Sequence, residues 1–213
     1  MYIIGGTIKT MAGGDILDGC IRIENGKIAE IGKRDEVDFH PVSGERVIEI
    51  RKGIIMPGII EAHCHMGISE EKKGMEGDDC NETVDPMTPQ LRAIDAINTM
   101  DAAFDDAVRA GITSAMIGPG SSNVVGGQFV FLKTKGRRVD DLVVKAPAAM
   151  KVAFGENPKV NYSGQGKSPS TRMAIAAMLR EELFKARRYY EKKCGGMKAE
   201  DEDFHYEAWI PVF

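Results

Sequence analysis

The sequence predicts a protein of the α/β class, in which a small all-β part precedes a part built from strands and helices. Three observations support this. Short alternating apolar stretches with turn signals fill residues 1–55. Residues 56–117 read as strand, polar loop, helix and strand, and a long helical pattern runs from about residue 170 to Cys194. We expect two domains, 1–55 and 56–213.

The composition is that of an ordinary soluble globular protein. The 213 residues carry a formal net charge of -4, with 28% charged and 43% hydrophobic residues. This balance argues against a nucleic-acid or membrane-surface partner. No apolar run reaches the ~20 residues that span a bilayer, and the N-terminus lacks the features of a signal peptide. Four scattered cysteines without CxxC spacing indicate reduced thiols and a cytoplasmic location.

The first 55 residues contain a clear hairpin signal. In "GCIRIENGKIAEIG", Asn25-Gly26 separates two stretches of alternating isoleucines, which is typical of a tight two-residue turn. "YIIGGTIKT" and "ERVIEIRKG" supply further strands. A β unit of this length buries little surface alone. We therefore expect it to pack on another part of the protein or to be completed by another segment.

The second part begins with "GIIMPGII", a nearly continuous apolar run that predicts a strand buried on both faces. After a polar stretch, apolar residues at spacings of three and four predict a helix over 88–110, capped by Thr88 and ended by Gly111. "ITSAMIG" then predicts another buried strand. Strand, helix and strand form a βαβ crossover, which builds parallel sheets. "GQFVFLKTKGRR" and "DLVVKAPAAMKVAF" add strand-like material.

His63 and His65 stand one residue apart at the end of the apolar run. Side chains alternate along a strand, so both imidazoles project from one face and Cys64 from the other. Two imidazoles side by side are half of a metal site, and imidazole suits zinc. The alternative is a pair of solvated histidines in a turn. Reactive residues in parallel α/β folds gather at the carboxyl ends of strands, which favours the metal.

The stretch "IIMPGIIEAHCHMG" resembles the first-strand signature of the amidohydrolase superfamily, the metal-dependent hydrolases of imidazolonepropionase and dihydroorotase type. "ENGKIAEIG" is similar to that family's N-terminal β-sandwich, and "AGITSAMIGPGSSNVVGGQ" to its second strand and following loop. Glu61 departs from the family's usual Asp. The resemblance implies a (β/α)8 TIM barrel preceded by a small β-sandwich. It also implies a catalytic divalent metal, expected to be zinc with one or two ions, bound by His63 and His65.

The resemblance further implies a carbamylated lysine or a glutamate that bridges two metals. "AAMKVAFGENP" offers Lys151 and Glu156. We prefer Lys151, because a buried ammonium is costly and carbamylation would turn it into an anionic oxygen ligand. The alternative is a lysine whose stem reaches the surface. Glu156 could equally be a loop residue.

Other expected parts of the site are harder to assign. The resemblance implies two further histidine ligands and an aspartate that acts as general base, but no Asp of this sequence can be matched to that role. The only later histidine, His205, reads as a surface or helix residue. "GPGSSNVVGGQ" lacks the end of a P-loop, and its residues could line a substrate pocket with backbone N–H groups. The substrate-binding candidates are Gly126, Gly127 and Gln128.

The chain is short for a complete barrel. Residues 56–213 number 158, which is 213 − 55, against about 250 for a barrel. We count three or four βα units and expect a C-terminal half, in the same or a separate chain. The first hypothesis is a metal-dependent amidohydrolase that cleaves a C–N bond of a small cyclic amide or similar substrate through a metal-activated water. The second is a catalytically inactive fragment or scaffold that binds a partner half or subunit. A homo-oligomer is also expected.

Overall fold

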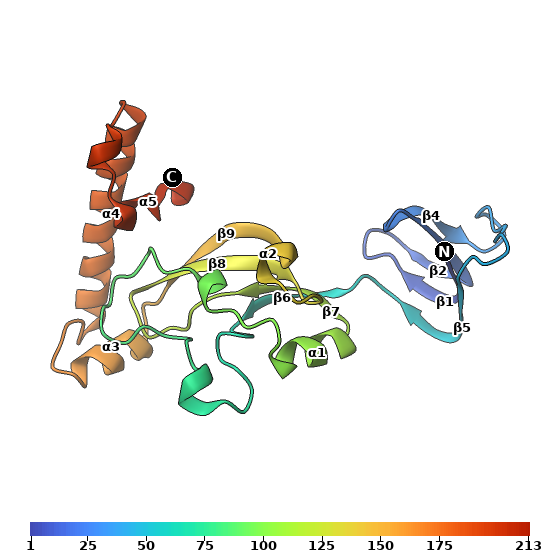
Figure 1. Ribbon diagram of the computed structural model, residues 1–213, viewed down its shortest axis with the longest axis horizontal. Coiled ribbons are helices and arrows are strands. Elements are labelled where there is room, and N and C mark those ends of the chain that lie inside the picture. Colours follow the sequence, from blue (N-terminus) through green and yellow to red (C-terminus); the bar gives the residue numbers. More distant parts are fainter. The chain divides into compact units, whose positions relative to one another are not determined.

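The computed structural model describes all 213 residues. It divides into two compact units, Met1–Gly58 and Ile59–Phe213 (Figure 1). Each unit contains one β-sheet, and the helices belong to the second unit. This arrangement confirms the α/β class. None of the helices combines the length and the hydrophobicity that a membrane-spanning helix needs.

The first unit is a five-stranded sheet. Its strands are β1 (Tyr2–Lys9), β2 (Asp15–Leu17), β3 (Gly19–Glu24), β4 (Lys27–Lys33) and β5 (Val47–Ile55). They run in the order β2-β1-β3-β4, and β5 pairs with β1 in parallel. β3 and β4 form the predicted hairpin. Its turn residues Asn25 and Gly26 have φ values of 51° and 73°, which an Asn-Gly turn tolerates.

The two faces of this sheet differ. Tyr2, Ile4 and Cys20 are buried on one face together with Val37. The other face carries a row of isoleucines that lie directly opposite one another on β5, β1, β3 and β4: Ile48, Ile3, Ile21 and Ile31. Ile31 at the end of this row is 41% exposed. An apolar sheet face normally packs against another layer.

The sheet of the second unit has four strands in sequence order. These are β6 (Ile59–Cys64), β7 (Ile112–Ile117), β8 (Val125–Lys133) and β9 (Val143–Val152). β6 and β7 are parallel, and helix α1 (Ala102–Arg109) connects them, so the predicted crossover is confirmed. β8 is antiparallel to both of its neighbours. The structure thus has one parallel βαβ crossover and not the expected three or four βα units, because the chain turns back after β7.

The chain reverses direction between β7 and β8 and again between β8 and β9. β9 therefore runs in the same direction as β6 and β7. The carboxyl ends of these three strands therefore lie at one edge of the sheet. The start of β8 lies at the same edge, because Val125 pairs with Val152. This edge brings together segments that are far apart in the sequence.

Helices and short 3-10 turns make up the rest of the unit. The helices are α2 (Val139–Leu142), α3 (Glu156–Ser163), α4 (Arg172–Cys194) and α5 (Phe204–Glu207). The 3-10 turns are η1 (Gly74–Gly77), η2 (Ala93–Asp95), η3 (Ala199–Asp201) and η4 (Ile210–Val212). The predicted long helix is confirmed as α4, where the Thr171 side chain accepts a hydrogen bond from the Ala174 amide.

The predicted helix over 88–110 is wrong in its first half. Only Ala102–Arg109 is α-helical, and Asp101 caps it in place of Thr88. Thr88 is buried, and its hydroxyl donates to the Val125 carbonyl at 3.0 Å. Isolated bridges also join this stretch to β8. Tertiary pairing with β8 therefore outweighs a local helical pattern.

The apolar run "GIIMPGII" is not one buried strand. β5 ends at Ile55 and β6 begins at Ile59. Ile59 and Ile60 are 48% and 60% exposed, and Met56 is 50% exposed. β6 is an edge strand that pairs only with β7, so its apolar side chains lack a neighbour on the other side.

The buried Phe104 ring should contribute strongly to the stability of the second unit. Phe104 of α1 is 3% exposed and packs in the cluster that contains Ala115, Ile117 and Leu132. Phe104→Ala should lower the free energy of unfolding by about 3–5 kcal/mol, through lost burial and the cavity left behind. Urea unfolding followed by the fluorescence of Trp209, the single tryptophan, measures this change.

The matched control for this measurement is Phe184→Ala. Phe184 is 63% exposed on α4. Its loss should change the free energy of unfolding by less than about 0.5 kcal/mol. Equal effects of the two substitutions would contradict the assignment of Phe104 to the core.

Candidate metal centre

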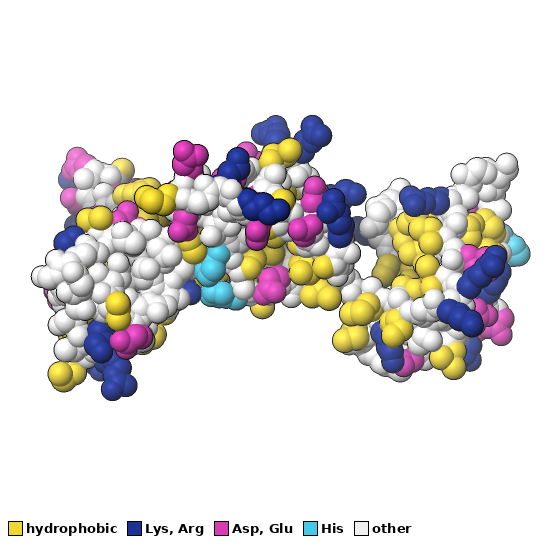
Figure 2. Space-filling model, turned by 90° about the horizontal axis from the view of Figure 1, so that it is seen from below, with side chains coloured by type: hydrophobic (Ala, Val, Ile, Leu, Met, Phe, Trp, Pro, Cys, Tyr) yellow, Lys and Arg dark blue, Asp and Glu magenta, His cyan; other side chains and the backbone are white.

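The histidine pair lies where β6 ends. His63 is the penultimate residue of β6, and His65 directly follows the strand. The two ring centroids are 5.3 Å apart and the ring planes stand at 85°. Cys64 between them packs against the apolar core cluster instead. Figure 2 shows histidine side chains (cyan) gathered on the surface of the second unit.

His65 has a defined orientation. Its Nδ1 lies 2.7 Å from the carbonyl oxygen of Gly118, the residue that follows β7. A carbonyl can only accept, so Nδ1 carries the proton and donates it. The lone pair of neutral His65 is therefore on Nε2. Metal-binding histidines are commonly held in this way by a hydrogen bond from the other ring nitrogen.

His63 lies in an environment that favours its neutral form. Its ring contacts the ring of Phe129, with the centroids 5.3 Å apart. The pKa of His63 is lowered, first by desolvation and then by electrostatic interactions with Lys151 and His65. Glu61 acts in the opposite direction, and its carboxylate accepts a hydrogen bond from the His63 backbone amide at 3.0 Å. A neutral imidazole is the form that binds metals.

Lys151 lies at the same edge of the sheet. It is half-buried near the end of β9, opposite Gly127 of β8. Burial lowers the pKa of Lys151, and the neighbouring Cys80 partly offsets this. A lowered pKa increases the fraction of neutral amine, which is the form that reacts with carbon dioxide to give a carbamate. Lys151 is also one of the groups that lower the pKa of His63.

Glu156 lies elsewhere. It is the first residue of α3, and its side chain is 71% exposed. Its carboxylate forms an ion pair with Lys159 at 3.7 Å. The structure therefore places His63, His65 and Lys151 at one edge of the sheet and leaves Glu156 on the surface.

The expected substrate-binding residues begin β8, and their polar groups are partly used. The Gln128 amide donates to the Leu91 carbonyl at 2.7 Å, and the Gln128 side chain donates to the Pro89 carbonyl at 3.3 Å. Gly127 has φ +122°, and a Cβ there would collide with the Leu91 carbonyl. These contacts hold the preceding loop against β8. Gly126 lines a hollow next to the loop after β6.

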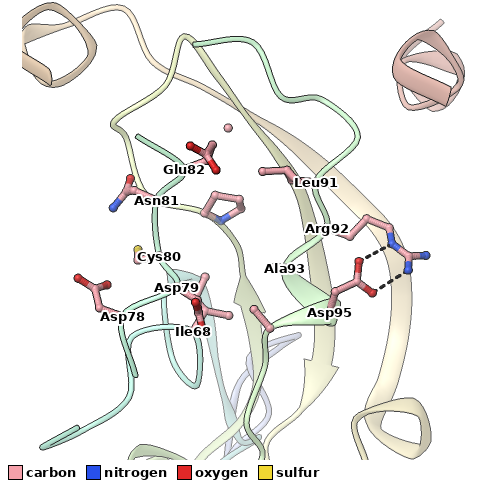
Figure 3. A pocket seen from close by; sticks show the side chains of 13 residues that line it. Ile68, Asp78, Asp79, Cys80, Asn81, Glu82, Leu91, Arg92, Ala93 and Asp95 are labelled. Atoms are coloured by element: carbon pink, nitrogen blue, oxygen red, sulfur yellow. Dashed lines mark hydrogen bonds and ion pairs between the residues drawn. The ribbon is translucent and has the colours of Figure 1, made fainter. Parts of the chain in front are cut away.

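This hollow has a volume of about 440 Å³ and a mixed lining (Figure 3). Acidic and polar side chains from the loop after β6 meet an apolar side formed mainly by Leu91 and Ala93. The Arg92 guanidinium donates two hydrogen bonds, of 2.9 and 2.7 Å, to the carboxylate of Asp95. The hollow adjoins Lys151, since a Cβ on Gly126 would lie 3.3 Å from its Cγ.

The lining of this hollow does not follow from any motif in the sequence. Asp79, Cys80, Asn81 and Glu82 belong to a stretch that reads only as a polar loop. The dense run "GDDCNETVDP" is the signal that could have found them, because such a concentration of polar side chains is unusual for a mere connection.

Few side chains near His63 and His65 could bind a metal ion. No group of three or more His, Cys, Asp or Glu side chains is arranged to hold a metal ion. A catalytic zinc ion usually has three protein ligands. His205 does not contribute, since its Nε2 hydrogen-bonds Glu182 at 2.5 Å and Glu182 also accepts from Trp209.

The fold and this site define an α/β protein with a histidine pair at the carboxyl end of a sheet strand. The chain matches part of a protein of the amidohydrolase superfamily, as its sequence predicts. It is 33% identical to the solved structure of an amidohydrolase from Thermotoga maritima, with a TM-score of 0.88. That match covers 97% of this chain and 54% of the Thermotoga chain. No family model matches the chain.

Two curated relatives are also similar to this chain over part of their length. The amidohydrolase tasK of Hapsidospora irregularis is 28% identical over 197 residues, which are 86% of this chain and 19% of tasK. The dihydroorotase of Thermococcus kodakarensis is 42% identical over 60 residues, 28% of this chain and 13% of that enzyme. The chain thus spans about a fifth or less of these two relatives.

Proposed function

We propose that the chain is part of a metal-dependent amidohydrolase that hydrolyses a C–N bond of a cyclic amide or amide-like substrate. The observation that carries this proposal is the histidine pair. His63 and His65 lie side by side, one with a lowered pKa and the other with its Nδ1 proton committed to a carbonyl. The names of the relatives, an amidohydrolase and a dihydroorotase, support the same reaction class.

The residues present fit a divalent metal in part. His63 and His65 would supply two nitrogen ligands, and zinc is the metal that suits them best. Lys151, as a carbamate, would supply an oxygen ligand from the end of β9. When bound, the metal supplies an activated water for attack on the substrate.

The chain's own residues have distinct roles in this proposal. The Gly118 carbonyl fixes the tautomer of His65, and Phe129 shields one side of His63. Gly126 and the hollow beside it would hold the substrate next to Lys151. These groups bind and orient, while the general base is supplied from elsewhere.

A complete (β/α)8 barrel and a β-sandwich are part of the same proposal. The free edge of β6, with Ile59 and Ile60 exposed, offers a place for another barrel strand. The isoleucine row on the first unit offers an apolar face for a second sheet layer. A C-terminal half, in the same or a separate chain, would supply both.

A second candidate function is an inactive scaffold that binds such a half. The absence of a third His, Cys, Asp or Glu ligand favours it. Zinc-dependent hydrolysis of hydantoin, imidazolone or acyl-amino-acid substrates by the chain together with its C-terminal half would support the enzyme. A folded assembly that neither binds zinc nor hydrolyses any of them would support the scaffold.

The identity of the third ligand gives a direct prediction. Lys151→Ala should weaken zinc binding by about 10-fold or more, because it removes the expected carbamate oxygen. Glu156→Gln should leave zinc binding within about twofold, because that carboxylate is engaged with Lys159 on the surface. Equilibrium dialysis with bicarbonate present measures both affinities. The opposite ranking would assign the ligand to Glu156.

A further inference from the structure

We propose that Phe129 and Gly118 act as one positioning unit that sets both histidine rings. The proposal rests on the proposed function, since it concerns the same metal centre. Neither residue offers a ligand atom to a metal through its side chain. Their effect is to fix where the two imidazoles stand and which ring nitrogen is available.

Phe129 reaches His63 across an intervening strand. It lies on β8, which pairs with β7 and not with β6. Even so, the rings of Phe129 and His63 have their centroids 5.3 Å apart, with an angle of 51° between their planes. The Phe129 ring therefore passes over the end of β7, where Gly118 follows Ile117.

Gly118 is the reason why the ring can pass there. A Cβ built on Gly118 would overlap the ring of Phe129, and its three nearest atoms all belong to that ring. No left-handed φ is found at Gly118, so space requires the glycine and backbone conformation does not. The missing side chain leaves the volume that Phe129 fills.

The backbone of Gly118 holds the second histidine. Its carbonyl accepts the Nδ1 proton of His65 at 2.7 Å. Its amide donates to the carbonyl of Cys64, between the two histidines, at 3.2 Å. A shift of Gly118 would therefore move the His65 acceptor and the Phe129 ring together.

Burial supports a role for Phe129 at the site. The side chain is 5% exposed, yet it belongs to none of the three clusters of buried apolar residues. Its neighbours Val130 and Leu132 on β8 do belong to the main cluster. Phe129 thus lies on the opposite side of the strand, among the histidines and Gly118.

Cobalt binding by the 213-residue chain tests the proposal. Cobalt(II) gives a visible spectrum that reports ligand geometry, so the readout does not depend on activity. Phe129→Leu should weaken cobalt binding by about 10- to 100-fold, the usual effect of losing a residue that orients metal ligands. It should also change the spectrum of the bound ion. Phe129→Tyr, which keeps the ring, should restore most of the affinity.

Phe131→Leu is the matched control. Phe131 lies two residues along β8 and is half-buried, opposite Met116 of β7. The same chemical change there should cost comparable stability and leave cobalt affinity within about twofold. Equal cobalt affinities for Phe129→Leu and Phe131→Leu would overturn the positioning role of Phe129 but not the proposed metal centre.

A double-mutant cycle tests the coupling. Gly118→Ala should weaken cobalt binding by about 10-fold or more in the wild-type background. In a Phe129→Ala background, where the obstructing ring is gone, the same substitution should have little further effect. Additive losses would contradict a single unit. A wild-type chain that binds no cobalt, or binds it after loss of both histidines, would instead overturn the proposed metal centre.

Discussion

Replacement of His63 or His65 by alanine should lower the zinc affinity of the chain by more than about 100-fold. Loss of a residue that only orients a metal ligand costs about 10- to 100-fold, so loss of a ligand should cost more. The two substitutions should have similar effects, since each removes one of two nitrogen ligands from a site with few others. Equilibrium dialysis of the 213-residue chain, with zinc quantified on the same sample, measures the loss.

The pH dependence of zinc binding follows from the same site. The pKa of His63 is lowered, so this ring loses its proton at a lower pH than an ordinary histidine. The contribution of His63 to zinc binding should therefore persist below the pH at which an ordinary histidine takes up a proton, and should be lost on further acidification.

The chain offers a matched control for the histidine substitutions. His40 is 88% exposed in the first unit and lies 3.3 Å from Asp38. His40→Ala should leave zinc affinity unchanged within about twofold. Zinc binding that survives loss of His63 or His65 but fails after His40→Ala would contradict a metal centre at the end of β6.

Features of the fold that depend on local spacing could be predicted from the sequence. The Asn25-Gly26 turn follows from backbone conformations that few other residue pairs adopt. The two histidines lie close together because side chains alternate along a strand. Helix α4 follows from a sustained helical pattern that runs from about residue 170 to Cys194. In each case the residues that decide the structure are neighbours in the chain.

Features that depend on pairing between distant segments could not be predicted. The stretch after Thr88 has helical spacing, but its backbone and side chains bond to β8. Lys151 approaches His63 only because two strand reversals bring the end of β9 to the edge where β6 ends. The Phe129 contact depends on the missing side chain of Gly118 at the end of another strand. The spacing of residues along the sequence carries no information about these contacts between distant segments.

The largest expected effect concerns turnover. The isolated 213-residue chain should hydrolyse cyclic amides poorly or not at all. It brings two histidines and one lysine to the edge of the sheet, and no group of three or more His, Cys, Asp or Glu side chains is arranged there to hold a metal ion. Hydrolysis also needs a base near the activated water, and no aspartate of this chain can be assigned that role. Loss of a general base typically costs 10²- to 10⁴-fold in rate.

Activity should appear when a C-terminal half is supplied, covalently or as a second chain. The chain covers 54% of the Thermotoga amidohydrolase, so a C-terminal half of similar length could supply the further strands and ligands of the proposed barrel. The assay compares the short chain with a version extended to the length of a barrel, about 250 residues beyond the first unit. Hydantoin, imidazolone and acyl-amino-acid substrates are tested with and without zinc. The extended protein should exceed the short chain by at least about 100-fold. Full zinc-dependent turnover by the short chain would mean that its own side chains include the base and that the barrel is not needed to complete the site.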